Sequence, residues 1–319
     1  KLERLSQVQY LADLPWKECP ADWTAPFSPL MTGPYFDWPL VTDLFPWQEN
    51  GVQFQRSWPI GETAEVLEQR WRVLLATKDR KAAFRETSDR RIARSYPNFN
   101  DKNNRLPPIA NIEADTPIPN VSHYAFRSFD RRFAILDNRL GDRMRPDLHR
   151  SYGGQQIFLT SFLTEVFGHG PAAVVTALIP DKHHFRGSFG GAHVIPLWRD
   201  AAATQPNITR GLLEFLSRRY GQPVGAGDLF AYAYALLATP DYVKTFWDEL
   251  ALPGPRLPLT QDAALFAEGA ALGRRLIWLH TYSERCVPPG EKPGRVPSGI
   301  ARCQVGTPAD PADYPERFD

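Results

Sequence analysis

The sequence contains few cysteines and no long apolar run. Only three of its 319 residues are cysteine, and no two of them form a CxxC pair. An odd number of widely spaced cysteines argues against a disulfide framework and a structural zinc site, and it favours a reducing, cytoplasmic location. Because no run of about 18 apolar residues occurs, we expect no transmembrane helix. We expect the chain, which starts at Lys1, to be part of a longer polypeptide.

The motifs of the common catalytic sites are missing as well. There is no GxxxxGK[ST] phosphate loop and no HExxH; Ser188 is not part of a GxSxG turn, because Arg186 stands two positions before it. Neither Pro-Pro pair has the flanking residues of the [DNS]PP[YFW] turn with which amino-methyltransferases hold the target amine. Pro180-Asp181 is not followed by the (Asp/Glu)-x-Lys of a magnesium-dependent nuclease. We therefore expect no catalytic residue in this chain.

The charge is balanced overall but unevenly distributed. Lys and Arg number 37 against 36 Asp and Glu, yet residues 78–150 contain 16 basic and 10 acidic residues. A basic middle with mildly acidic flanks is typical of a surface that binds phosphates. A solvated helix face with charged loops explains the same count, and both interpretations stay open at this point.

The pattern of apolar residues predicts an α+β fold. Many of the 30 prolines lie in residues 15–46 and 287–315, which indicates irregular ends. Residues 62–96 have helical spacing, including Trp71 and Leu74. Residues 122–136, 172–179 and 193–197 are strand-like, and the second run is apolar enough to be buried on both faces. We predict a central mixed or antiparallel sheet.

A helical subdomain is predicted to follow that sheet. Helical patterns cover residues 209–220, 228–238 and 242–250, and Thr260 is placed to cap a further helix. We expect the stripe of that last helix to be core, together with Trp278; it consists of Leu265, Leu272, Leu276 and Leu279.

A polar loop between the second and third predicted strands carries the densest group of donors. It contains Lys182, His183, His184, Arg186 and Ser188. Adjacent histidines on an extended segment point to opposite sides, so we predict no metal site. The composition favours a cationic loop that contacts phosphates or base edges, with a plain β-turn as the alternative.

Several motifs, taken in order, resemble one known family. Residues 124–133 (YAFRSFDRRF) resemble a block that follows the catalytic domain in adenine methyltransferases fused to restriction functions, although Ser128 replaces the usual proline and Phe126 stands between Tyr124 and Arg127. Further matches are DNRL at 137–140, DKHHF at 181–185, VIPLW at 194–198, YALLATPDY at 234–242 and LIWLHT at 276–281. As a set, they resemble the C-terminal specificity (target recognition) domain of type ISP restriction-modification enzymes.

The resemblance implies a role in reading double-stranded DNA for catalytic domains that lie upstream. In such a parent an adenine methyltransferase uses S-adenosylmethionine and a helicase-like motor uses ATP with magnesium, whereas this part carries no cofactor. Residues 1–104 would be a linker and helical segment leading from the methyltransferase domain. Residues 105–319 would be the target recognition domain, with a sheet part at about 120–200, a helical part at about 207–283 and a proline-rich tail at 284–319.

The candidate DNA contacts are basic or polar residues of the middle region. Arg139, Arg143 and Arg145 have a loop-like setting that suits phosphates. For Arg127 an internal ion pair with Asp130 is an equally good interpretation. The candidates are Arg127, Arg131, Arg132, Arg139, Arg143, Arg145, Lys182, His183, His184, Arg186 and Ser188.

Two other functions remain open on the sequence alone. One is a catalytic adenine methyltransferase fragment, which the missing motifs disfavour. The other is a protein-docking or coupling domain that touches DNA little.

Overall fold

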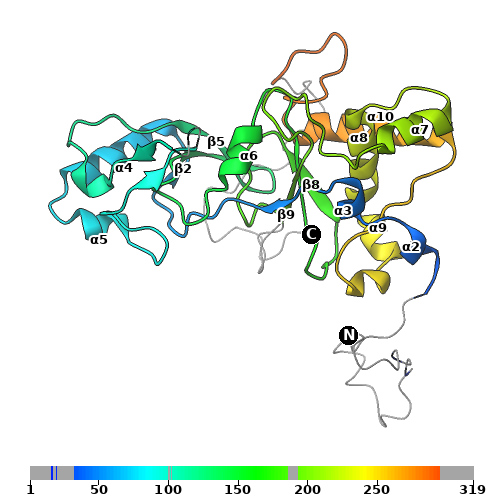
Figure 1. The fold of residues 1–319 in the computed structure, drawn as a ribbon, viewed down its shortest axis with the longest axis horizontal. Coiled ribbons are helices and arrows are strands. Elements are labelled where there is room, and N and C mark those ends of the chain that lie inside the picture. The colour runs from blue at the N-terminus through cyan, green and yellow to red at the C-terminus, as the bar shows by residue number, and fades with distance from the viewer. Residues whose placement is uncertain are drawn as a thin grey trace, which may run out of the picture.

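The computed structural model describes Trp16, Cys19 and residues 32–99, 101, 103–185 and 193–294. Figure 1 shows an elongated arrangement with α4, α5 and β2 at one end, α7–α10 at the other and the strands β8 and β9 between them. We call residues 52–152 the hairpin lobe and residues 207–280 the helical lobe. The α+β prediction is confirmed.

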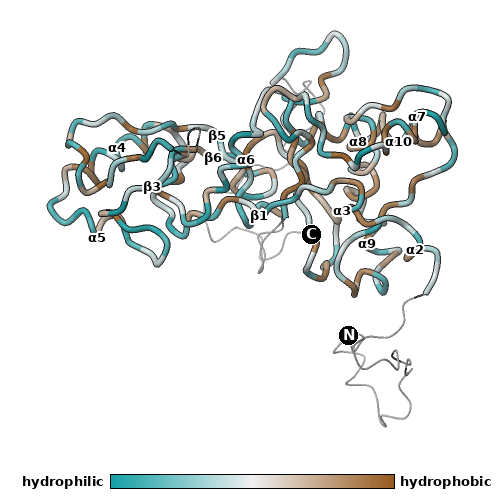
Figure 2. The backbone as a smooth tube through the Cα atoms, in the orientation of Figure 1, coloured by the Kyte–Doolittle hydropathy of each residue, from teal (hydrophilic) through white to brown (hydrophobic). Residues whose placement is uncertain are grey.

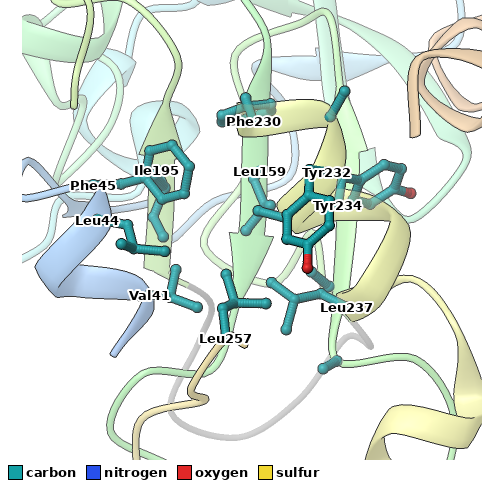
Figure 3. Packing of buried hydrophobic residues seen from close by; sticks show 14 of the residues in the cluster. Val41, Leu44, Phe45, Leu159, Ile195, Phe230, Tyr232, Tyr234, Leu237 and Leu257 are labelled. Atoms are coloured by element: carbon teal, nitrogen blue, oxygen red, sulfur yellow. The ribbon is translucent and has the colours of Figure 1, made fainter. Parts of the chain in front are cut away.

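The central sheet is antiparallel and has the order β1-β9-β7-β8. Its strands are β1 (Glu49–Asn50), β7 (Phe158–Ser161), β8 (Ala173–Thr176) and β9 (His193–Pro196). All residues of β7 and β8 are buried, and the burial of β8 confirms the prediction made from the apolar run 172–179. Figure 3 shows Val41, Leu44 and Phe45 beside Ile195, where they cover one part of the sheet.

The helical lobe packs on this sheet through α8. Its elements are α7 (Leu212–Tyr220), α8 (Ala226–Leu237), α9 (Pro240–Thr245), the 3-10 helix η3 (Glu249–Ala251) and α10 (Ala263–His280). Two short helices before the sheet, α2 (Pro34–Asp37) and α3 (Val41–Leu44), complete this core. Leu229, Phe230 and Tyr234 of α8 are fully buried, and the ring of Phe230 meets that of Phe45 edge-on at 5.5 Å.

The predicted stripe of α10 is wrong for Leu265 and Leu272, whereas half-buried Leu276 packs against the core as expected. Leu265 and Leu272 are 54% and 57% exposed, whereas Phe266 and Gly273 face the core. The reason is a close helix crossing, because a Cβ on Gly273 would lie 1.8 Å from the Ala231 carbonyl oxygen of α8. A glycine therefore lies at the contact, and the bulky leucines beside it face outward. Trp278 is buried, as predicted, but Asp262 rather than Thr260 caps the helix.

The hairpin lobe is built on the strand pair β5 and β6 with one helix across it. Its elements are β2 (Ile60–Gly61), α4 (Ala64–Ala76), α5 (Arg80–Phe84), β3 (Tyr96–Pro97), β4 (Arg105–Leu106), the 3-10 helix η2 (Ile109–Asn111), β5 (Val121–Arg127), β6 (Asp130–Ile135) and α6 (Pro146–Ser151). β2, β6 and β5 form an antiparallel sheet, and the buried face of α4 packs on it through Leu67, Trp71 and Leu74. In Figure 2 the chain around α5 is mainly hydrophilic, whereas the strands toward the centre are hydrophobic.

Packing does not divide the chain at residue 104. Leu67, Trp71 and Phe84 lie in the same apolar cluster as Tyr124 and Ile135. Residues 64–84 are thus part of the body that contains the hairpin, and the expected boundary between a linker (1–104) and a recognition domain (105–319) does not coincide with a break in the core. Most of the predicted proline-rich tail, from residue 295 onward, lies outside the described residues.

Candidate nucleic-acid interface

An open cleft of about 440 Å³ lies where the hairpin lobe meets the segment after β8. Residues 53–57, the end of β5 and residues 181–183 surround it, together with Ile60 and Arg85. Its polar lining consists of Gln53, Gln55, Arg56, Ser57, Arg85, Arg127, Asp181, Lys182 and His183.

Backbone hydrogen bonds hold residues 51–53 between two neighbours. On one side Val52 N donates to Pro180 O (2.9 Å) and Lys182 N donates to Val52 O (2.7 Å). On the other side Gln53 and Arg143 exchange two backbone hydrogen bonds of 2.9 and 3.0 Å. Gly51 allows the approach, since a Cβ there would lie 2.4 Å from Asp181 O. Residues 143 and 182, far apart in sequence, are thereby placed on either side of one extended segment.

Asp181 is the central acceptor of the cleft. Its carboxylate accepts hydrogen bonds from Tyr124 Oη (2.8 Å), Arg127 Nη1 (2.9 Å) and His183 N (2.7 Å). Burial raises the pKa of Asp181, while these three partners favour the charged form. Arg127 is therefore paired with Asp181, and the ion pair with Asp130 considered from the sequence is not formed; Asp130 pairs with Arg132 instead.

Four amide or cationic side chains of the cleft have no partner among the described residues: Gln53, Gln55, Arg85 and Lys182. Gln55 and Arg85 are exposed, and Gln53 and Lys182 are half-buried. Two are amides, with both a donor and an acceptor, and two are cations. The cleft thus offers a set of hydrogen-bonding groups that the protein itself does not use.

An aromatic ring borders the cleft beneath two guanidinium groups. Arg127 lies 3.9 Å and Arg132 lies 5.1 Å from the centre of the Phe126 ring. Such stacking restrains both arginines and leaves the edge of each guanidinium group for hydrogen bonding. Arg132 also pairs with Glu62, so its charge is partly compensated.

The structure brings together some of the residues predicted as DNA contacts. Arg127, Lys182 and His183 line the cleft. Arg143 and Arg145 lie next to residues 51–53, but each forms an ion pair, Arg143 with Asp89 at 2.7 Å and Arg145 with Glu49 at 3.6 Å. These pairs must open or be shared for either arginine to bind a phosphate.

Arg131 is directed elsewhere. Its guanidinium group pairs with Glu284 at 2.5 Å and lies 4.9 Å from the centre of the Tyr282 ring. Arg131 thus ties the hairpin to the segment that follows α10.

Two candidates are buried, which corrects their assignment. Arg139 is 7% exposed and holds the carboxylate of Asp137 with two hydrogen bonds of 2.9 and 2.7 Å. His184 is 2% exposed with Nδ1 2.9 Å from Thr160 Oγ1, and burial lowers its pKa to about 3, so the ring is neutral. The buried His184 ring does not reach a ligand in this conformation, and the guanidinium group of Arg139 is already bound to Asp137 and Pro107 O. Arg186 and Ser188 lie outside the described residues.

Sequence reasoning missed the contribution of residues 53–57 and of Arg85. Residues 53–57 fall within the predicted linker and Arg85 within the helical pattern of residues 62–96, so neither is among the candidate contacts. The alternation of Gln53 and Gln55 with buried Phe54 and Arg56 was the available signal, since it places both amides on one side of the chain.

Two further findings bear on the class of protein. No group of three or more His, Cys, Asp or Glu side chains suited to a metal ion occurs in the described residues. Across the same part of the chain, no helix is both long and apolar enough to cross a membrane.

Comparison with known proteins identifies the family. The fold is similar to two large solved structures. One is the ATP-dependent type ISP restriction-modification enzyme LlaBIII bound to DNA, with a TM-score of 0.55, 14% identity and coverage of 79% of this chain and 17% of that one. The other is a DrdV-DNA complex, with a TM-score of 0.51, 18% identity and coverage of 75% and 23%. No curated protein sequence matches. The model of the type ISP C-terminal specificity domain matches residues 43–317, and the chain therefore belongs to that family.

Proposed function

We propose that this chain recognises a duplex DNA sequence and that the cleft between residues 53–57 and 181–183 is its DNA-contacting surface. The observation that carries the proposal is the group of unpartnered side chains there: Gln53, Gln55, Arg85 and Lys182. Amide and guanidinium groups are the side chains that read base edges, and lysine and arginine neutralise phosphates. Membership of a specificity-domain family and a fold shared with enzymes solved on DNA support the same conclusion.

The chain acts within a longer polypeptide in this proposal. It spans less than a quarter of the length of the solved enzymes that it matches. The parent would supply a nuclease, a helicase-like ATPase and an adenine methyltransferase, with S-adenosylmethionine, ATP and magnesium as their cofactors. This chain would carry none of these activities and would help to present the target adenine. The exposed Leu265 and Leu272 of α10 offer an apolar surface for contact with such a neighbouring domain.

Salt-dependent binding tests the location of the interface. Lys182→Ala removes one free cation of the cleft, so we expect weaker binding to duplex DNA and a log–log salt dependence that is flatter by about one unit. Arg72→Ala is the matched control, because Arg72 is an exposed cation on α4 that lines no part of the cleft. Fluorescence anisotropy with duplexes at several salt concentrations measures both quantities. Equal losses in the two variants would place the DNA on another face.

A further inference from the structure

Two exposed residues of the cleft adopt a backbone conformation that their side chains disfavour. Gln55 has φ 58° and Arg85 has φ 57°, both in the left-handed region. Arg85 follows helix α5 at a position where glycine is the usual residue. The residues are 30 positions apart in sequence, yet both line the same cleft. Strained residues that converge on one surface point to a functional use of that surface.

One buried guanidinium group contacts Arg85 and belongs to the residue that follows Gln55. The side chain of Arg56 is 1% exposed; its Nη2 donates to Arg85 O at 3.2 Å, and its Nη1 donates to Leu140 O. The same group lies 4.7 Å from the centre of the Phe84 ring. Gln55 thus stands between buried Phe54 and Arg56, and Arg85 follows buried Phe84. Because these neighbours are held inside, the side chains of Gln55 and Arg85 are held at the cleft surface.

The chemistry of the pair suits bases better than phosphates. A glutamine carries no charge, so a phosphate gains little from it, but its amide can bind N6 and N7 of adenine at the same time. An arginine in a fixed position can bind O6 and N7 of guanine in the same bidentate manner. Both contacts need a defined direction, which a restrained backbone provides. Neither side chain has a partner among the described residues.

We infer that Gln55 and Arg85 are specificity-determining residues that read an adenine and a guanine, with Arg56 as the positioning residue behind them. The inference rests on the proposed function, since it assumes that duplex DNA occupies the cleft. Lys182 supplies charge beside the pair and is not one of the readers.

Glycine variants separate recognition from stability. Gln55→Gly and Arg85→Gly remove the side chain at positions where glycine is unstrained, so we expect both variants to melt at or above the temperature of the unmodified chain. Ala203→Gly is the matched control, because Ala203 also has a left-handed φ of 57° but lines no part of the cleft. Arg85→Lys keeps the charge and loses the planar fork.

The experiment is selection of bound duplexes from a pool with a randomised central segment, followed by sequencing. The unmodified chain and Ala203→Gly should enrich the same motif. Gln55→Gly should lose the preference for adenine at one position, and Arg85→Gly and Arg85→Lys the preference for guanine at another, each by about 5-fold to about 150-fold. If the variants fold and retain every preference, the inference is overturned while the proposed function stands. If the unmodified chain binds no duplex, the proposed function fails and the inference fails with it.

Discussion

The helical lobe and the hairpin lobe are each stabilised internally by a different kind of interaction. In the helical lobe α8 and α10 pack through apolar side chains and small residues, with Gly273 against the backbone of Ala231. In the hairpin lobe buried charged groups join the parts, among them Arg56 with Asp142 and Arg139 with Asp137. Among the described residues, the buried Arg and Asp side chains all lie between residues 56 and 181.

This difference shows why the number of basic residues in 78–150 overestimates how many of them are available to bind DNA. Several of its arginines are used internally: Arg80 donates to the carbonyl oxygens of Ile109 and Ile112, and Arg90 to that of Asn138. Such arginines donate hydrogen bonds to backbone carbonyl groups of irregular segments, which have no partner in a helix or sheet. The cations available to a ligand are therefore fewer than the count of basic residues; Arg85 in the cleft is one of them, and exposed Lys78 outside the cleft is another.

The largest effect is expected from breaking the buried charges of the hairpin lobe. Arg56→Ala leaves the carboxylate of Asp142, whose side chain is 7% exposed, without its guanidinium partner, and it also frees two carbonyl groups. We expect the free energy of unfolding to fall by about 3–5 kcal/mol. Denaturant titration followed by circular dichroism measures the change.

The control for Arg56 is an exposed ion pair on the same lobe. Arg72→Ala breaks a pair with Glu68 in which both side chains are well exposed, and it should cost less than about 1 kcal/mol. Similar losses in the two variants would mean that apolar packing holds the hairpin lobe as well, and the contrast between the lobes would disappear.

Periodicity and turn residues predicted the elements well, because these depend on local sequence. The run 172–179 contains β8, and α7 ends at Gly221, which has φ 68° as a left-handed C-cap. The burial of Leu265 and Leu272 was predicted wrongly because the interhelical contact is made by Gly273, which no hydrophobicity pattern marks.

The site was only partly predictable, for a related reason. Lys182 and His183 were recognised because donors are dense in their loop, but their neighbours Gln53 and Arg85 come from other parts of the chain. The backbone pairing of Val52 with residues 180 and 182 brings Gln53 to this loop, and a hydrogen bond from Arg56 to Arg85 O holds Arg85 near them. The left-handed φ angles of Gln55 and Arg85 occur beside buried Arg56, whose contacts a local pattern does not contain.

The close crossing in the helical lobe is the next point to test. Gly273→Ala places a methyl group against the Ala231 backbone, so the helices must separate, and we expect a loss of about 1–3 kcal/mol. Gly227→Ala is the control in the same helix pair, because a Cβ there meets nothing within 4 Å. It should be neutral or slightly stabilising, since alanine favours the helix. Thermal melting of both variants decides whether the small residue at the crossing matters; equal melting temperatures would argue that it does not.

The smallest effect is expected at the outward-facing leucines of α10. Leu265 and Leu272 are more than half exposed, so truncation to alanine removes little buried surface and leaves no cavity. We expect each variant to change the free energy of unfolding by less than about 0.5 kcal/mol.

Leu229→Ala on the facing helix α8 is the matched comparison, because Leu229 is 0% exposed and its loss should cost about 2–5 kcal/mol. A loss at Leu272 that approaches the loss at Leu229 would mean that the side chain is covered within the folded chain in solution. A negligible loss would leave Leu265 and Leu272 free to serve as a contact surface for another domain.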